Sequence, residues 1–299
     1  MHLNIETLII GAGYAGLLCQ KRLDDIGRQR NFIIDKGDSV KFASRDYVIV
    51  MREPTEFTDQ NPTKMYLNRI NSGEAPFEVE YPRKLYNKET KLILGEEDME
   101  EEEIYLIDNA KLMEGSRVYG NIDVTEIDRC NKIVTGKVNH FNKIATFRYE
   151  KLICTIPIYE FAKLCGFDLM QTYNIFVSFF PIGIIRKTAE EYSSEIIMTY
   201  FSDPQIPFYR RHHFGKSIFY EYCINKPYSI NFHTVIAPGK FMTPDEEKLR
   251  YFYQIMAEDC NIFFAGRFAT WHTDFRLDDI FHPRENHVAS NILREAFIQ

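Results

Sequence analysis

The sequence predicts an α/β fold in which a discontinuous domain with a parallel sheet carries an inserted, mostly antiparallel β domain. Apolar runs alternate with helix-compatible segments at the start of the chain, again from residue 118 and again near the end. The stretch 173–236 is instead rich in β-branched and aromatic residues, which favour strands. We assign residues 1–50, 116–166 and 255–299 to the discontinuous domain and 51–115 and 167–254 to the inserted one.

The first strand–helix–strand unit carries a glycine motif. Gly11, Gly13 and Gly16 fit the pattern G-x-G-x-x-G, directly after the apolar run 8–10 and before a helix predicted over 17–26. The first glycine allows a tight turn, the second lets the backbone approach a pyrophosphate, and the third lets the helix pack closely on the strand. The N-terminus of the helix then offers unpaired N–H groups to the phosphates. This context predicts a Rossmann-type dinucleotide-binding unit.

The second strand of this unit, 32–34, ends at an acidic residue. Asp35 lies 19 residues after the last glycine of the motif, where an acid binds a ribose hydroxyl. A carboxylate there repels the 2′-phosphate of NADP, although the neighbouring Lys36 tempers this argument. Tyr14 and Ala15 complete the loop and are further candidate contacts of the dinucleotide. The motif alone leaves NAD and FAD open.

The remaining elements follow in order. Prolines at 54, 62, 76 and 82 interrupt the segment after the first unit, and an acidic run at 96–103 ends it. Thr243 and Pro244, followed by acids, predict a helix start. Strands are predicted at 48–50, 121–128, 133–138, 145–149, 151–156, 175–185, 196–201, 217–223 and 261–267, and helices at 159–165, 244–257 and 283–297.

Composition excludes several classes of protein. The chain has 299 residues, of which 45% are hydrophobic, enough for one large domain or two interlocked ones. Its apolar runs are too short for a membrane helix, and the first strand leaves no room for a signal peptide, so we expect a cytoplasmic protein that does not contact a membrane. Six scattered cysteines indicate reduced thiols and no metal site. A net charge of −7 argues against binding to a nucleic-acid backbone.

Four segments in this order resemble the flavoprotein superfamily of amine oxidases, protoporphyrinogen oxidase and UDP-galactopyranose mutase. They are the glycine motif with Asp35, the alternating segment NIDVTEIDRCNKIV (121–134), the strand YEKLICTIP (149–157), and NIFFAGRFATWHTDFRLDDI (261–280). The resemblance covers the nucleotide-binding half of the chain. This chain departs from the family in having Asp35 where glutamate is usual and no glycine pair in 36–46.

The resemblance implies FAD as the cofactor and assigns roles to residues. The backbone at Val124 matches the position that contacts the adenine, and Thr155 belongs to the family's T-x-P strand ending. Gly266 would let the chain pass close to the diphosphate or ribityl, and Arg267 would supply a charge-assisted contact. A helix N-terminus near 277–279 would point at the flavin pyrimidine.

Candidate catalytic residues lie in two places. In the segment 207–213, PFYRRHH, Arg210 or Arg211 would bind a carboxylate or phosphate, and His212 or His213 would move protons. A solvated basic strand edge is the competing interpretation. Trp271 and His272 follow the Gly-Arg segment, where the family chain passes the flavin ring. For Trp271, packing in the protein core is the competing interpretation.

We expect an FAD-dependent oxidoreductase of the amine oxidase type, which oxidises a small amine or amino-acid-like molecule by hydride transfer to flavin N5. A substrate with a carboxylate or phosphate would explain the paired arginines. Three alternatives stay open: a non-redox mutase similar to UDP-galactopyranose mutase, a flavin-dependent lyase or oxidase acting on an amino-acid adduct of a modified nucleobase, and a non-catalytic dinucleotide-binding module. The oligomeric state is left open.

Overall fold

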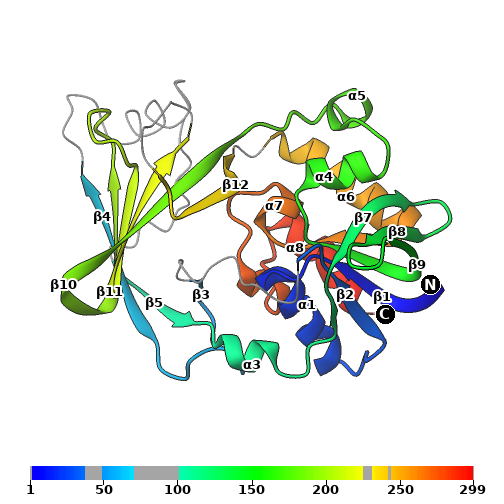
Figure 1. The fold of residues 1–299 in the computed structure, drawn as a ribbon, viewed down its shortest axis with the longest axis horizontal. Helices are drawn as coiled ribbons and strands as arrows, with labels where there is room; N and C mark the ends of the chain where they lie inside the picture. Colours follow the sequence, from blue (N-terminus) through cyan, green and yellow to red (C-terminus); the bar gives the residue numbers. More distant parts are fainter. Residues whose placement is uncertain (1, 38–48, 71–100, 225–230, 242–243, 299) are drawn as a thin grey trace. The chain divides into compact units, whose positions relative to one another are not determined.

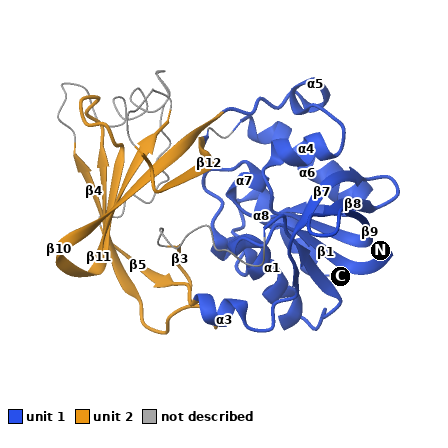
Figure 2. Cartoon of the chain, in the orientation of Figure 1, with its two compact units in different colours: residues 1–43, 109–178, 241–299 blue, residues 44–108, 179–240 orange. Residues whose placement is uncertain are grey.

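The computed structural model describes residues 2–37, 49–70, 101–224, 231–241 and 244–298. The chain divides into two compact units (Figure 2). Unit 1 holds residues 1–43, 109–178 and 241–299, and unit 2 holds 44–108 and 179–240. Predicted features at residues 48, 76, 82, 96–100 and 243 lie outside the described residues.

Unit 1 is built on a sheet whose described strands run in the order β6-β2-β1-β9-β8-β7, with β13 also paired to β9 (Figure 1). β1 is parallel to β2 and β9, and β13 is parallel to β9. The antiparallel partner β8 pairs with the first half of β9, and β13 pairs with its end. The strands are β1 (His2–Ile10), β2 (Asn31–Ile34), β6 (Val118–Tyr119), β7 (Ile122–Asp128), β8 (Ile133–Val138), β9 (Lys143–Cys154) and β13 (Ile262–Phe264).

Continuous apolar runs explain the parallel part of this sheet. Residues 8–10 of β1 and 152–154 of β9 are buried, as expected for strands covered on both faces. Helices α6 and α8 pack against β13, and α1 packs against β2. The helices of unit 1 are α1 (Tyr14–Asp25), α3 (Asn109–Met113), α4 (Ile158–Leu164), α5 (Leu169–Tyr173), α6 (Glu246–Cys260), α7 (Arg267–Thr270), the 3-10 helix η1 (Leu277–Ile280) and α8 (Val288–Ile298).

Unit 2 is a second sheet, with the described strand order β11-β10-β4-β5-β3 and β12 paired to β10. β10 and β11 are antiparallel, as are β4 and β5, whereas β10 and β4 are parallel. The mostly antiparallel character of the insertion agrees with the predicted fold class. The strands are β3 (Val50–Met51), β4 (Thr63–Ile70), β5 (Glu101–Leu106), β10 (Phe179–Phe201), β11 (Arg210–Cys223) and β12 (Thr234–Phe241).

Two predicted strands prove to be one. The run 175–185, from residue 179 onward, and the run 196–201 both belong to β10, which spans 23 residues and stays paired to β11 across two register irregularities. Polar residues between the runs hid this continuity, because bulges let a strand carry unpaired polar residues without ending. Likewise, 145–149 and 151–156 are largely one strand, β9.

The start of α6 and several domain boundaries differ from the prediction. Asp245 caps α6, and its carboxylate accepts hydrogen bonds from the N–H groups of Glu247 and Lys248, so Pro244 precedes the cap. Since α6 packs on β13 and α8, it belongs to unit 1. Residues 109–115, 167–178 and 241–254 therefore lie in unit 1, and 44–50 lie in unit 2.

Among the helices that the structure describes, none is both long enough and apolar enough to cross a membrane.

Candidate functional site

The carboxyl ends of four parallel strands meet at one edge of the unit 1 sheet. Ile10 at the end of β1 is in register with Ile34 of β2 and Cys154 of β9, and Cys154 is in register with Phe264 of β13. The residues that follow these ends include predicted cofactor contacts from four separate parts of the sequence, namely Gly11, Asp35, Thr155 and Gly266. Open α/β sheets bind ligands outside this edge.

Glycines at this edge permit close packing between the segments. A Cβ at Gly16 would lie 2.0 Å from the carbonyl oxygen of Gly11, so only glycine lets α1 start so close to β1. Gly11 has φ +103°, and a Cβ there would lie 2.4 Å from Oγ1 of Thr155. Gly266 has φ +92°, and its Cβ would lie 2.9 Å from Cβ of Ala15. The predicted first and last cofactor segments are therefore in contact.

Gly13 differs from these glycines. A Cβ at Gly13 would meet no heavy atom of the described residues within 4 Å. Gly13 also caps α1 with an extended backbone and no side-chain hydrogen bond. The first-turn amides of a helix need partners outside the helix, and a phosphate at such an end gains from the helix dipole. The open space and the uncapped helix end fit a dinucleotide pyrophosphate.

Asp35 fastens the glycine loop. Its carboxylate accepts hydrogen bonds from the N–H of Ala12, at 2.7 Å, and of Gly37, at 2.6 Å. Its own carbonyl accepts from the N–H of Ile122, at 2.9 Å, which brings the start of β7 beside it. Two lone pairs on the half-buried carboxylate are thus used on the protein, and a carboxylate has further acceptor capacity for a ribose hydroxyl.

Val124, Lys36 and Arg267 are three further predicted contacts of the cofactor. Val124 lies on β7, two residues after the strand's contact with Asp35, and pairs with Gly136 of β8. Lys36 forms an ion pair with Asp123 at 3.3 Å, but 76% of its side chain is exposed, so the pair contributes little stability. Arg267 is the exposed first residue of α7.

Thr155 supports the loop. Its Oγ1 donates to the carbonyl oxygen of Ile10, at 2.8 Å, which holds the end of β9 to the end of β1.

The helix N-terminus predicted near 277–279 is η1, which packs against α1. The backbone N–H of Arg276 at this end donates to the carboxylate of Asp279 at 2.7 Å, so this amide is already bound by an acid of the protein.

Trp271 is a core residue of unit 1. Its side chain is fully buried, and its ring centroid lies 4.6 Å from that of Phe241 and 5.7 Å from that of Tyr159. The structure therefore places the indole in packing, the competing interpretation of the sequence, and not at a surface where it could stack on a flavin.

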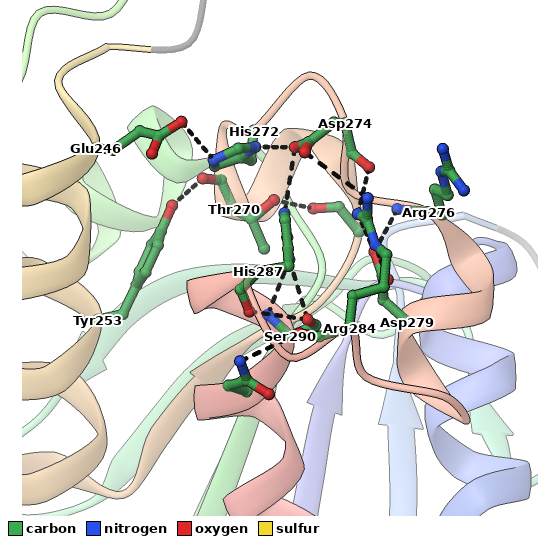
Figure 3. Close-up of polar contacts among 12 residues, drawn as sticks. Glu246, Tyr253, Thr270, His272, Asp274, Arg276, Asp279, Arg284, His287 and Ser290 are labelled. Carbon is green, nitrogen blue, oxygen red and sulfur yellow. Dashed lines mark hydrogen bonds and ion pairs between the residues drawn. The ribbon is translucent and has the colours of Figure 1, made fainter. Parts of the chain in front are cut away.

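His272 belongs to a polar cluster that joins the loop after α7 to the start of α8. Figure 3 shows the rings of His272 and His287 directed at the carboxylate of Asp274. Asp274 Oδ1 contacts His272 Nδ1 and lies 3.2 Å from His287 Nε2. Burial alone would raise the pKa of Asp274, but the hydrogen bonds from both histidines outweigh it and hold the pKa well below its ordinary value. The carboxylate is therefore ionised at neutral pH.

Arg210 and His212 converge on an acid of unit 2 that the sequence analysis did not single out. Arg210 donates to both carboxylate oxygens of Glu221, each at 2.9 Å. His212 Nε2 contacts Glu221 Oε1, and the hydroxyl of Tyr209 donates to Oε2. Glu221 is fully buried, and these partners satisfy both oxygens. Arg210 is thus bound to the protein's own carboxylate, and it is not the free cation that the predicted substrate-binding role requires.

Burial and the neighbouring charges together set the protonation states of Glu221 and His212. Burial would raise the pKa of Glu221, but Arg210 and His212 outweigh it and hold the pKa well below its ordinary value. Burial lowers the pKa of His212, with the Arg210 charge acting in the same direction and Glu221 opposing it. At neutral pH the network therefore holds an ionised glutamate and a neutral histidine, which counts against His212 as a proton donor.

Acid is expected to destabilise this network. As the pH falls below about 6.5, the unfolded chain protonates His212 while the folded chain resists it, so the free energy of unfolding decreases. Below about pH 4.5 the contribution of Glu221 is lost as well, since its folded pKa is depressed. Urea unfolding of the wild type and His212→Gln at about pH 7, 6 and 5 should show a shallower pH dependence in the variant, by at most about 1.4 kcal/mol per unit.

The neighbouring variant His213→Gln is the matched control, because His213 bonds the carbonyl of Glu191 and lies outside the network. It should keep the wild-type pH dependence. Equal slopes for the wild type and His212→Gln would contradict this assignment of charges.

No family model matches the sequence, and no curated protein matches it either. Among the solved structures that are similar to this chain, two match it along nearly its whole length. Reduced UDP-galactopyranose mutase is 13% identical with a TM-score of 0.60, covering 98% of this chain and 97% of that one. A CLA-producing fatty acid isomerase from P. acnes is 12% identical with a TM-score of 0.56, covering 98% and 99%. These similarities confirm the predicted fold class.

Proposed function

We propose that the chain is an FAD-dependent enzyme whose cofactor binds along the carboxyl ends of β1, β2, β9 and β13. The meeting of the glycine loop, Asp35 and the Gly266 turn at this edge carries the proposal, together with the open space at Gly13. The fold shared with UDP-galactopyranose mutase supports FAD over NAD.

Each segment has a part in holding the cofactor. The uncapped amides of α1 and the backbone at Gly13 bind the diphosphate, and Asp35 binds the ribose. The backbone at Val124 lies on the strand beside Asp35 and contacts the adenine. The exposed Arg267 pairs with a phosphate. Bound FAD supplies the electron acceptor, which protein side chains do not provide.

We propose that the reaction is the oxidation of an amine or amino-acid-like group by hydride transfer to the flavin. Support comes from the resemblance to the amine oxidases and from a pair of side chains in unit 2. Arg211 and Thr199 face each other across β11 and β10. Arg211 Nε and Thr199 Oγ1 are buried and have no hydrogen-bond partner among the described residues.

Buried polar groups are normally satisfied, so two neighbouring unsatisfied donors mark a place for an acceptor from outside the chain. A carboxylate or phosphate suits a guanidinium beside a hydroxyl. Arg211, and not the occupied Arg210, is therefore the arginine that we assign to the acid group of the substrate.

The test is anaerobic reduction of the FAD-loaded protein by a panel of amines and amino acids. We expect an acid-bearing amine to bleach the flavin absorption. Arg211→Met should raise KM for that substrate by about 10- to 100-fold, equivalent to a charge-assisted hydrogen bond of about 1.5–3 kcal/mol. Lys216→Met, which removes an exposed cation from the same strand, should leave KM unchanged. A KM insensitive to Arg211→Met would refute the assigned role.

The second candidate is a non-redox mutase acting on a nucleotide-sugar, favoured by the similarity to UDP-galactopyranose mutase over nearly the whole of both chains. Activity would then require prior reduction of the flavin, and amines would leave the absorption unchanged. Release of an amino-acid fragment from a modified nucleobase would indicate the lyase alternative. FAD binding without turnover in any of these assays would indicate a non-catalytic module.

A further inference from the structure

We propose that His272, Asp274 and His287 form a binding site for a divalent transition-metal ion of the Zn²⁺ type. One ligand atom from each residue can be chosen so that all three lie within 4.8 Å of one another. Two imidazoles and one carboxylate are ligands that suit Zn²⁺ and its neighbours among the divalent metals. The site is independent of the FAD proposal.

The backbone holds the three residues in place from both sides. His272 directly follows Trp271, which has φ +48° and is locked in the core. His287 directly precedes α8 and is 5% exposed. The loop between these anchors brings the three residues together, and both rings point at the Asp274 carboxylate (Figure 3). A metal here would join the loop after α7 to α8.

The spacing of the ligand atoms fits a tetrahedral ion. Zn–N and Zn–O bonds of about 2.0–2.2 Å place neighbouring ligand atoms about 3.3–3.6 Å apart. His287 Nε2 and Asp274 Oδ1 are already 3.2 Å apart. His272 Nδ1 contacts the same carboxylate oxygen, so a small rotation of one side chain opens the third position. Three protein ligands leave a fourth position for water or another molecule.

The far nitrogen of each imidazole has a partner, as metal-ligating histidines require. His287 Nδ1 lies 3.1 Å from Oγ of Ser290 and accepts a hydrogen bond from the backbone N–H of Ser290 at 3.2 Å, while the Ser290 hydroxyl donates to the carbonyl of His287. His272 Nε2 lies 3.6 Å from Glu246 Oε1. Nε2 of His287 and Nδ1 of His272 face the Asp274 carboxylate, and a metal that binds there displaces the protons on these inner nitrogens.

The cation beside the site has its own counter-charge. Arg284 Nη1 lies 3.8 Å from Asp274 Oδ2, and Arg284 Nη2 donates to the carbonyl of Asp274 at 2.7 Å. The same guanidinium is bound by both oxygens of the buried Asp279, at 2.7 and 2.9 Å. Asp274 therefore keeps its charge available to a metal.

A competing account is that the three side chains only hydrogen-bond to one another. In that account the protons stay on the inner nitrogens, Asp274 keeps accepting both hydrogen bonds, and no metal displaces them. The two accounts differ in stoichiometric metal uptake, which does not depend on catalytic activity.

The experiment is titration of chelator-treated protein, freed of any histidine tag, with ZnCl₂, with metal content measured after gel filtration. We expect one Zn²⁺ per chain and a rise in the melting midpoint, because an ion that binds only the folded state stabilises it. His287→Ala and Asp274→Asn should each weaken binding by more than about 100-fold, since loss of a mere outer partner costs about 10- to 100-fold. Ser290→Ala, which removes such an outer partner, should fall within that smaller range.

His282→Ala is the matched control, because it removes an exposed imidazole from the same loop outside the cluster, and it should bind Zn²⁺ like the wild type. The wild-type stoichiometry needs no variant, so a variant that fails to fold does not leave the proposal untested. Uptake well below one ion per chain, or uptake unchanged by both Asp274→Asn and His287→Ala, would overturn it.

Discussion

Replacing Gly16 by alanine is expected to abolish FAD binding and to destabilise unit 1 by about 3 kcal/mol, the upper end of the usual cost of overpacking. The added Cβ would lie 2.0 Å from the carbonyl oxygen of Gly11. A backbone atom cannot rotate away as a side chain can, so α1 must move off the end of β1. The amides that we assign to the diphosphate move with it. Urea unfolding and FAD titration measure the two effects.

Gly13→Ala separates the two effects, because it is the same substitution in the same loop. Gly13 has φ −75°, which alanine adopts, and its added Cβ would meet no described atom within 4 Å. We expect stability within about 0.5 kcal/mol of the wild type. The methyl group projects into the space assigned to the ligand, so FAD affinity should fall at least about 10-fold, or 1.4 kcal/mol. Wild-type FAD affinity in Gly13→Ala would place the diphosphate elsewhere.

Glu221→Gln should destabilise the protein by about 3–5 kcal/mol, the cost of breaking a buried ion pair from one side. Glu221 is fully buried and accepts two hydrogen bonds from the guanidinium of Arg210. The Arg210 side chain is 15% exposed. The glutamine keeps the shape of the side chain but removes its charge, which leaves a partly buried cation without its partner. Chemical denaturation compares the variant with the wild type.

The control is Glu190→Gln on the exposed part of β10, which should change stability by less than about 0.5 kcal/mol. Adding Arg210→Met to Glu221→Gln should recover part of the lost stability, because neither charge is then unpaired. If the double variant is destabilised by the full sum of the single effects, the two residues are not coupled as the structure indicates.

Local sequence signals predicted the parts of the fold that depend on neighbouring residues. The strand–helix–strand unit around Gly11 and Gly16, the strand 121–128 and the hairpin that leads into β9 all follow from apolar periodicity and turn residues. The meeting of Gly11, Asp35 and Gly266 at one sheet edge follows from the parallel pairing of their strands, because parallel strands place their carboxyl ends together.

Contacts between distant residues could not be predicted in this way. Arg210 and His212 stood out in the sequence by their charge, but their partner Glu221 lies on the same strand, 11 and 9 residues further along. The irregular register between β10 and β11, which accompanies this contact, is not visible in the periodicity of the sequence. Arg210 and His212 share the parity that places them on one face of a strand, but Glu221 has the other parity, so periodicity did not indicate their contact. His287 likewise has no spacing signature with His272 and Asp274, because an irregular loop brings them together.

The most direct test of the central claim is the visible absorption spectrum of the purified protein, followed by identification of the chromophore released on heating. A dinucleotide site at the ends of β1, β2, β9 and β13 predicts the two visible bands of oxidised flavin, with FAD released at about one molecule per chain. Protein purified without cofactor should take up added FAD and regain these bands. A folded, colourless protein that does not bind added FAD would contradict the proposed function.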